Sequence, residues 1–189
     1  MTPVRSVRAV HLPGARCTLR EWTDADAPVL HAFLTEPAVA DGLLDDDVPT
    51  LDAVTAAVAA WRAAAGDEPR PEYRLAAVDG DRLVGLGVLA VTSAEHRRGE
   101  IGYAVRTSYQ GGGLGTEIAA LLLDLAFTRV GLHRVEATTR PDNVASQRVL
   151  AKAGLRPEGV SRDHLLVRGV WWDSARYAIL ATDRFHGGD

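Results

Sequence analysis

The stretch Tyr109-Gln110-Gly111-Gly112-Gly113-Leu114-Gly115 decides how this sequence is expected to fold. A β-rich apolar run precedes it at residues 100–105, and apolar residues recur after it at helical spacing as far as Val130. Glycines between a strand and a helix allow a sharp turn and let several backbone N–H groups point at one ligand. The stretch therefore predicts a strand, a glycine loop suited to a phosphate, and a helix.

Further strands and helices are predicted on both sides of this loop. Before it, the pattern predicts a strand at residues 17–21, a helix from Thr23 to about Leu34, a second helix after Thr50 with Leu51, Val54, Val58 and Trp61 on one face, and a hairpin of residues 73–78 and 83–91. After it, the pattern predicts a strand at residues 134–139, a helix at 143–153 that Gly154 ends, and paired strands at 156–167 and 170–182. This order predicts a mixed, partly parallel sheet with helices packed on it, in the α/β or α+β class.

Length and charge limit the domain count and the kind of partner. The 189 residues are 47% hydrophobic and 24% charged, which is typical of one globular domain, assigned here to residues 17–184 after an N-terminal extension at residues 1–16. A formal charge of -4 provides no basic field for nucleic acid or an anionic membrane. No apolar run approaches the roughly 20 residues that span a bilayer. The expected partner is a small substrate or a peptide.

Cysteine and histidine usage narrows the chemistry further. Cys17 is the only cysteine, so no internal disulfide is possible, and the N-terminal residues contain no secretory apolar core. These observations indicate a cytoplasmic protein. The six histidines show no paired metal-ligand spacing, and we expect no metal site.

Three loop chemistries compete for the glycine stretch. A nucleoside-triphosphate loop needs Lys followed by Ser or Thr after its last glycine, but Thr116 and Glu117 stand there. A dinucleotide fingerprint needs a third glycine where Ile118 stands. The third pattern, Gln/Arg-x-x-Gly-x-Gly/Ala, is met by residues 110–115, and in it N–H groups alone hold a pyrophosphate at a helix N-terminus. A glycine turn that binds no ligand is the remaining alternative.

This third pattern resembles that of the GNAT acetyltransferases, and its surroundings resemble the RimJ/RimL-type N-acetyltransferases over about residues 17–180. The resembling segments are, in family order, Glu100-Ile101-Gly102-Tyr103, His133-Arg134-Val135-Glu136-Ala137, Pro141-Asp142-Asn143-Val144-Ala145-Ser146, Lys152-Ala153-Gly154-Leu155, Glu158-Gly159 and Trp172-Asp173. Gly115 and Leu155 replace residues that are often alanine and phenylalanine in that group. The loop also lacks a residue that is often basic, which bears on the affinity for the cofactor.

The resemblance implies a GNAT fold and acetyl transfer from acetyl-CoA to a primary amine, with CoA as the product. The implied fold has a mixed central sheet of about seven strands, splayed in the middle, with helices on both faces. The pantetheine arm would lie in the splay. The residues expected to bind the cofactor are Tyr103, Ala104, Val105, Gln110, Gly111, Gly112, Gly113, Leu114, Gly115, Thr116, Asn143 and Ser146.

Glu100 and Ser146 are the predicted catalytic residues. Strand alternation places Glu100 and Gly102 on one face, so Glu100 can act as the base if that face fronts the acceptor groove. Asn143 and Ser146 share a helix face, and in the resembled family the serine protonates the leaving thiolate. A solvated carboxylate at Glu100 and a plain helix cap at Asn143 are the structural alternatives. Tyr103 and Tyr109 are alternative proton donors.

The acceptor is predicted to be a protein or peptide N-terminal α-amine. Its pKa of about 8 requires less help from a base than the 10.4 of a lysine side chain. A polyamine, an amino acid or an aminoglycoside is the alternative acceptor, and a non-catalytic CoA-binding module is the alternative function. Residues 23–61 are expected to shape the acceptor groove, with one ring of Trp171-Trp172 as a wall. Exposed sheet edges are compatible with a homodimer.

Overall fold

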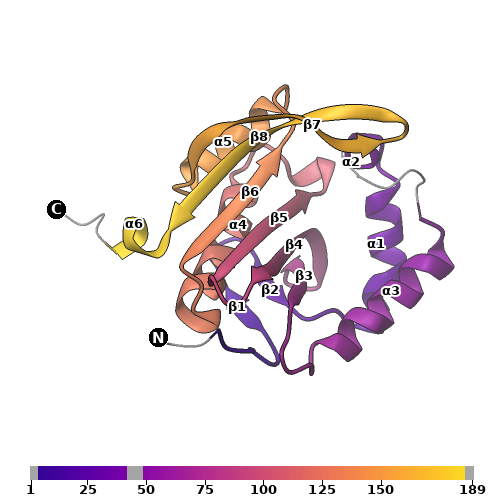
Figure 1. The fold of residues 1–189 in the computed structure, drawn as a ribbon. Helices are drawn as coiled ribbons and strands as arrows, with labels where there is room; N and C mark the ends of the chain where they lie inside the picture. Colours follow the sequence, from indigo (N-terminus) through magenta and orange to yellow (C-terminus); the bar gives the residue numbers. More distant parts are fainter. Residues whose placement is uncertain (1–3, 42–48, 186–189) are drawn as a thin grey trace.

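The structure of the protein, a computed structural model, describes residues 4–41 and 49–185. Its strands are β1 (His11–Pro13), β2 (Thr18–Arg20), β3 (Glu72–Asp79), β4 (Arg82–Ser93), β5 (Arg98–Val105), β6 (Arg134–Thr139), β7 (Arg156–Val167) and β8 (Val170–Leu180). In these ranges the eight strands form one mixed sheet in the order β1-β2-β3-β4-β5-β6-β8-β7 (Figure 1). The predicted mixed sheet is confirmed, with one strand more than the sequence indicated.

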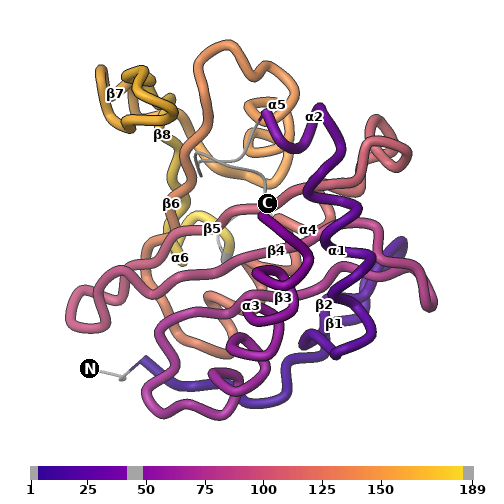
Figure 2. Tube along the Cα trace, turned by 90° about the vertical axis from the view of Figure 1, so that its right-hand side faces the viewer, coloured from indigo at the N-terminus to yellow at the C-terminus, as the bar shows by residue number. Residues whose placement is uncertain are grey.

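Two helical layers cover opposite faces of the sheet (Figures 1 and 2). The longer helical segments are α1 (Ala27–Leu34), α3 (Leu51–Ala64), α4 (Leu114–Asp124), the π-helical η3 (Leu125–Val130) and α5 (Val144–Lys152); the shorter ones are η1 (Asp24–Asp26), α2 (Pro37–Ala40), η2 (Thr107–Tyr109) and α6 (Ala181–Phe185). On one face α1 and α3 share a core cluster with Ala76 of β3. On the other face Leu75 of β3 lies in the core cluster of α4, and α5 packs beside α4 against β6 and β7. Because successive strand residues point to opposite faces, both faces of β3 are buried.

Most predicted element ends are confirmed by their caps. The Thr50 hydroxyl accepts a hydrogen bond from Ala53 N (3.2 Å) at the start of α3, and Gly154 has a φ of +95° at the end of α5. Leu51, predicted on the buried face of α3, is 44% exposed because it lies in the first turn. The strand predicted to reach residue 182 ends at Leu180, where α6 begins.

The N-terminal residues contribute to the same sheet. Strand β1 pairs antiparallel with β2, with His11 opposite Arg20. Val10 and Leu12 are each only 2% exposed and belong to the core beneath α4. Residues just before position 17 therefore pack against the predicted domain. No helix in the described part of the chain is long and apolar enough to cross a membrane.

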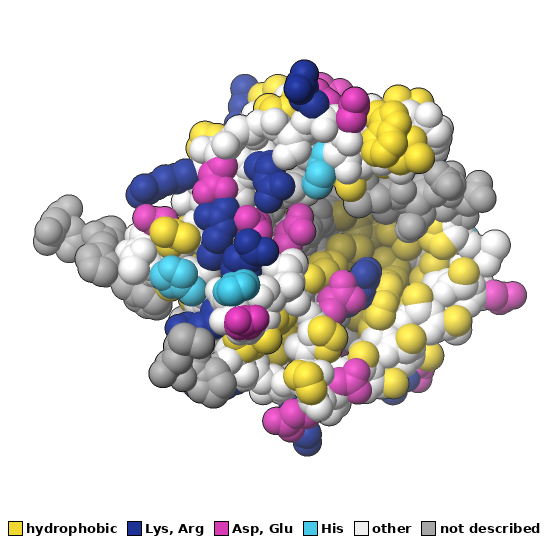
Figure 3. All heavy atoms as spheres, in the orientation of Figure 1, with side chains coloured by type: hydrophobic (Ala, Val, Ile, Leu, Met, Phe, Trp, Pro, Cys, Tyr) yellow, Lys and Arg dark blue, Asp and Glu magenta, His cyan; other side chains and the backbone are white. Residues whose placement is uncertain are grey.

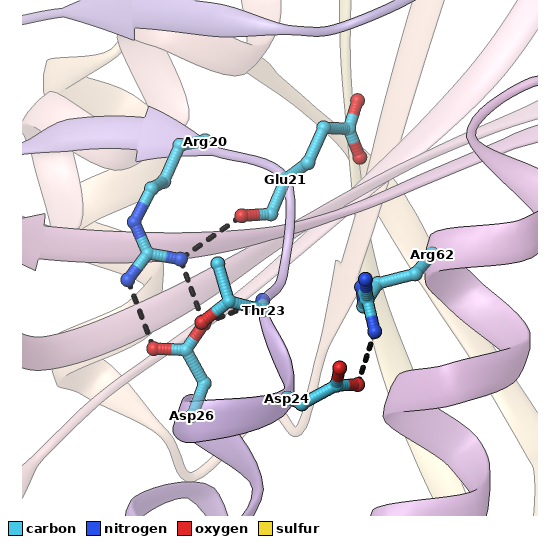
Figure 4. Close-up of polar contacts among 6 residues, drawn as sticks. All are labelled: Arg20, Glu21, Thr23, Asp24, Asp26 and Arg62. Carbon is cyan, nitrogen blue, oxygen red and sulfur yellow. Dashed lines mark hydrogen bonds and ion pairs between the residues drawn. The ribbon is translucent and has the colours of Figure 1, made fainter.

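A partly buried ion pair fixes the helical layer of α1 and α3 to β2 (Figure 4). The Arg20 guanidinium donates to both carboxylate oxygens of Asp26 at 2.7 and 2.9 Å, and Thr23 N and Oγ1 donate to Asp26 Oδ2 at 2.7 and 2.8 Å. Burial acts to raise the pKa of Asp26, but these hydrogen bonds outweigh it and lower that pKa below 3.8. Arg62 of α3 pairs with Asp24 at the same junction.

The sheet opens between β5 and β6. The two strands pair in parallel only over Arg98–Arg134, Gly99–Val135 and Glu100–Glu136, although each strand continues beyond these residues. The antiparallel pair β4–β5, by contrast, stays in register from Gly85 opposite Val105 to Ser93 opposite Arg98, with one irregularity near Val91. The splay predicted in the middle of the sheet is therefore confirmed.

Candidate active site

The gap between β5 and β6 is a cleft of about 470 Å³ that is lined from both faces of the sheet. Its walls include Glu100, Tyr103, Thr138, Ser146, Leu165 and Trp172. The face over which α1 and α3 lie is hollowed beside these helices, and hydrophobic side chains gather inside the hollow (Figure 3). The cleft thus connects the two helical layers through the sheet.

Glu100 lies on the face that α1 and α3 cover. Alternation along β5 places Glu100, Gly102 and Ala104 on one side, and Ala104 packs in the α1–α3 cluster. The Thr138 hydroxyl on β6 donates a hydrogen bond to Glu100 Oε1 at 3.1 Å, so the carboxylate is held at the opening of the splay. Glu100 therefore faces the groove, which is the condition for its predicted role as the base.

Tyr103 and Ser146 lie together on the opposite face. The Tyr103 hydroxyl is 3.0 Å from Ser146 Oγ, joining β5 to α5 across residues that are 43 positions apart. Burial raises the pKa of Tyr103, and the hydrogen bond with Ser146 offsets this only in part. The phenol is therefore protonated and uncharged at neutral pH.

Asn143 caps helix α5. Its Oδ1 accepts a hydrogen bond from Ser146 N at 3.0 Å, so the capping alternative is what the structure shows for this oxygen. Asn143 Nδ2 donates no hydrogen bond within the described residues, and Asn143 lines the cleft. The amide nitrogen can thus still donate to a ligand in the cleft.

The glycine loop opens onto solvent at the N-terminus of α4. Gly111 and Gly113 have φ angles of +80° and +87°, and a Cβ added at Gly111, Gly112 or Gly113 would meet nothing within 4 Å. Gly113 is the N-cap of α4 and supplies no side-chain cap, so the N–H groups of the first turn face outward. This open cradle of N–H groups at a helix N-terminus fits a pyrophosphate.

Two side chains hold the segment between β5 and this loop. Gln110 Nε2 donates to Val105 O at 3.0 Å. Glu36, just before α2, accepts from Thr107 N at 2.8 Å and from Arg106 Nε at 2.9 Å. The segment leading to the loop is therefore tied to β5 and to the helical layer that borders the groove.

The main chain of β5 divides between two neighbours. Arg106 N donates to Val84 O of β4 at 3.0 Å, and in an antiparallel ladder alternate residues face the same neighbour. Ala104 therefore turns its N–H and C=O to β4, which corrects the expectation that its main chain faces the pantetheine arm. The N–H and C=O groups of Tyr103 and Val105 face the gap, but Val105 O already accepts a hydrogen bond from Gln110 Nε2.

Apart from Ala104 and Val105 on β5, the predicted residues fall into two groups. Glu100, Tyr103, Asn143 and Ser146 line the cleft. Beyond it, between η2 and the first turn of α4, lie the loop residues Gln110, Gly111, Gly112, Gly113, Leu114, Gly115 and Thr116. The two groups thus suit different parts of one elongated ligand.

The wall formed by β7 and β8 combines one of the two predicted tryptophans with Leu165, which the sequence did not identify. Trp172 lines the cleft, with the Arg140 guanidinium 4.6 Å from the centre of its ring, whereas Trp171 is 57% exposed. Leu165 lies opposite Trp172 in register. Finding Leu165, or Thr138 beside Glu100, requires the strand register, which no local pattern supplies.

Comparison with known proteins identifies the family. The model of the acetyltransferase (GNAT) domain matches residues 16–156. The chain belongs to this GNAT family. GNAT-family enzymes use acetyl-CoA as their acetyl donor, so the predicted family is confirmed and its cofactor agrees with the predicted one.

Individual relatives extend the resemblance. A probable N-acetyltransferase of Bacillus subtilis, YjcK, is 38% identical over 54% of this chain, which spans only 58% of that relative. The ribosomal protein uS5-alanine N-acetyltransferase of Escherichia coli is 31% identical over 44% of this chain and 43% of its own. The structure of Mycobacterium smegmatis RimJ in complex with CoA-disulfide superposes with a TM-score of 0.81 at 28% identity, covering 97% of this chain and 91% of that one. The RimJ/RimL-type resemblance is thereby confirmed.

Proposed function

We propose that this protein transfers the acetyl group of acetyl-CoA to a primary amine, and that the amine is the N-terminal α-amine of a protein or peptide. One observation carries the proposal: the cleft passes through the sheet, with Glu100 on one face and the Tyr103–Ser146 pair on the other. An acyl transfer needs a base where the nucleophile enters and a hydrogen-bond donor where the leaving group departs. The two faces of the splay supply these groups on opposite sides.

The residues that would hold the cofactor follow the cleft toward α4. The N–H and C=O groups of Tyr103 and the N–H of Val105 face the gap and would pair with the pantetheine arm as a strand pairs with a sheet edge. The N–H groups at Gly113, Leu114, Gly115 and Thr116, at the positive end of the α4 dipole, would hold the pyrophosphate. Bound acetyl-CoA supplies an activated thioester. Asn143 Nδ2 would donate to an amide of the arm.

Glu100 and Ser146 would carry the proton transfers. Glu100 takes a proton from the attacking amine, directly or through one water, while Thr138 holds one of its oxygens. The new N–C bond forms as the C–S bond breaks, and the Ser146 hydroxyl donates its proton to the leaving sulfur. The proton that Glu100 has taken then returns to Ser146 through water, so that one proton has moved from the amine nitrogen to the sulfur. Both groups are held by a neighbour before any ligand binds, which lowers the cost of orienting them during the reaction.

An α-amine fits this site better than a lysine side chain. With a pKa of about 8, it is partly neutral at physiological pH, so a single carboxylate can complete its deprotonation. The apolar hollow beside α1 and α3 (Figure 3) would receive the residues that follow the N-terminus. The uS5-alanine enzyme of E. coli, whose name gives a protein substrate, supports the same choice.

Three further expectations belong to this proposal. We propose a cytoplasmic protein, which the single, buried Cys17 supports. We propose residues 17–184 as the domain, with β1 as an added edge strand. We also propose a homodimer, which the outer edge of β7, the end of the sheet in the described chain, supports.

Calorimetry with acetyl-CoA, followed by measurement of thiol release, tests the proposed function. The acceptor panel contains peptides that begin with alanine, serine or methionine, the same peptides with a blocked N-terminus, spermidine, and free amino acids. We expect the protein to bind acetyl-CoA, and we expect thiol release with the unblocked peptides only. Thiol release with spermidine or an amino acid would replace the proposed acceptor. Binding of acetyl-CoA without thiol release for any acceptor would favour a CoA-binding module, and failure to bind acetyl-CoA would overturn the proposal.

A further inference from the structure

We propose that Tyr103 is a positioning residue for Ser146: its phenol donates to Ser146 Oγ and thereby directs the Ser146 hydroxyl hydrogen into the cleft, toward the leaving sulfur. The inference rests on the proposed function. It assigns to Tyr103 a side-chain role in addition to the main-chain contact expected of β5. It also separates Tyr103 from the direct proton donors, because Tyr103 acts here only through Ser146.

Two contacts of the Tyr103 hydroxyl bear on the direction of donation, and we assign its hydrogen to the nearer acceptor, Ser146 Oγ. The Tyr103 hydroxyl is 3.0 Å from Ser146 Oγ and 3.4 Å from Ser146 O. The single phenol hydrogen therefore has two acceptors within reach, both on Ser146. A serine hydroxyl has one hydrogen and two acceptor lone pairs. When Tyr103 supplies its hydrogen to Oγ, the hydrogen of Ser146 must point elsewhere, and Ser146 lines the cleft.

The Ser146 backbone is fixed as well. Its N–H donates to Asn143 Oδ1 at 3.0 Å, which anchors Ser146 in the first turn of α5. The hydroxyl is thus held from two sides, by the Asn143 cap through the backbone and by Tyr103 through Oγ. A donor aligned in advance contributes more to a transition state than a freely rotating hydroxyl.

The Tyr103 ring is itself held in place. A Cβ added at Gly115 would lie 3.4 Å from Tyr103 Cε2, so the ring passes close to the first turn of α4. Tyr103 also packs against the core beneath α4. Burial raises the pKa of Tyr103, so the phenol keeps its hydrogen across the physiological pH range. The donor is therefore both fixed and protonated.

The first test measures the ionisation of bound coenzyme A and needs no acceptor amine. A donor directed at the sulfur stabilises the thiolate, so we expect the thiol pKa of bound coenzyme A to lie about one unit below that of the free molecule. Tyr103→Phe and Ser146→Ala should each abolish this pKa shift. Both substitutions leave the charged residues of the cleft, Glu100, Arg140 and Asp173, in place, so a lost shift would not come from a changed charge. An unshifted thiol in the wild type, or a shift that survives Tyr103→Phe, would overturn the inference.

The second test is a double-mutant cycle on turnover with the acceptor that the panel identifies. We expect Tyr103→Phe to lower kcat about 10-fold with little change in either KM, and Ser146→Ala to lower it by about 100-fold. The double variant should match Ser146→Ala alone, because Tyr103 acts through Ser146. A Tyr103→Phe loss of equal size in both backgrounds would overturn the inference and make Tyr103 an independent donor.

Tyr177→Phe is the matched control. It removes a phenol hydrogen bond to Gln147 Oε1, at 3.1 Å, on the residue that follows Ser146 in α5, but Tyr177 does not line the cleft. We expect its kcat and bound-thiol pKa to equal those of the wild type. If wild-type protein shows the thiol shift but acetylates no amine, the proposed function fails while the inference stands.

Discussion

The two seams of β5, by which we mean its pairings with β4 and with β6, differ in extent. The seam with β4 is closed: its antiparallel register runs from Gly85 opposite Val105 to Ser93 opposite Arg98. The seam with β6 pairs only three residues and then opens into the cleft. One strand thus supports the core through one edge and presents unpaired main-chain groups through the other. The difference shows that the site is made by leaving sheet hydrogen bonds unformed, as much as by the side chains placed there.

The largest expected effect comes from the carboxylate at the mouth of the open seam. Glu100→Gln keeps the size of the side chain and an oxygen for Thr138 but removes the base. We expect kcat to fall about 100-fold at neutral pH, the low end for general-base catalysis, with acetyl-CoA affinity unchanged. Steady-state kinetics and calorimetry measure the two quantities.

Glu136→Gln is the control for this variant. Glu136 lies opposite Glu100 in register, but it pairs with Arg134 and does not line the cleft. We expect its kcat to stay within about twofold of the wild type because its side chain lies outside the cleft. Equal kcat values for Glu100→Gln and the wild type would remove Glu100 as the base.

A pair of glycine substitutions compares the two seams directly. An added Cβ at Gly85, on the closed seam, would lie 2.5 Å from Ala104 O, whereas at Gly102 it would meet nothing within 4 Å and would project into the cleft. We expect Gly85→Ala to lower the free energy of unfolding by about 2 kcal/mol, as overpacking does. Gly102→Ala should keep its stability and lose activity. Denaturant unfolding measures the stability of both variants, and steady-state kinetics measures their activity. Equal losses of stability and of activity in the two variants would contradict the comparison.

The next effect concerns the glycine loop beyond the open seam. Gly113→Val places a branched side chain at a φ of +87° and in the space before the first turn of α4. We expect the Kd for acetyl-CoA to rise about 10-fold, from the loss of about 1.4 kcal/mol of binding free energy. Gly80→Val, at a φ of +57° in the β3–β4 turn, imposes similar backbone strain away from the site and should leave Kd unchanged. Equal Kd values for the wild type, Gly113→Val and Gly80→Val would contradict the assignment of the glycine loop to the pyrophosphate.

The smallest effect lies outside both seams, at Asp26. Asp26→Asn weakens the contact with Arg20 and should lower the free energy of unfolding by about 1 kcal/mol at neutral pH, with kcat unchanged. The pKa of Asp26 is lower in the folded protein than its ordinary 3.8, so protonation favours the unfolded state. The wild-type advantage should therefore hold at neutral pH and disappear as the pH falls through the lowered pKa. An advantage that does not depend on pH in denaturant titrations would contradict this account.

The sequence predicted local features of the molecule well. Caps, glycine stops and periodicity identified the helices and most strands because each of these features depends on neighbouring residues. The short strand β1 was missed because three residues that include Pro13 carry no alternation pattern. The helix predicted to continue to Val130 changes to a π-helical turn after Asp124, for which no sequence rule gave warning.

Contacts between distant residues could not be predicted in the same way. The family motif placed Glu100, Tyr103 and Ser146 in the site, but the Tyr103–Ser146 hydrogen bond joins residues 43 positions apart, and the Thr138–Glu100 bond depends on strand register. The main-chain direction of Ala104 likewise follows from pairing with β4 and not from its identity. Such features require the assembled sheet.

Amide hydrogen exchange of β5, resolved by residue, tests the central claim that the open edge of this strand binds the cofactor. Without ligand, the Ala104 N–H should exchange slowly because it faces β4, and those of Tyr103 and Val105 should exchange faster because they face the cleft. Saturating coenzyme A should slow exchange at Tyr103 and Val105 and leave Ala104 unchanged. Exchange at Tyr103 and Val105 that stays fast with coenzyme A bound would contradict the claim.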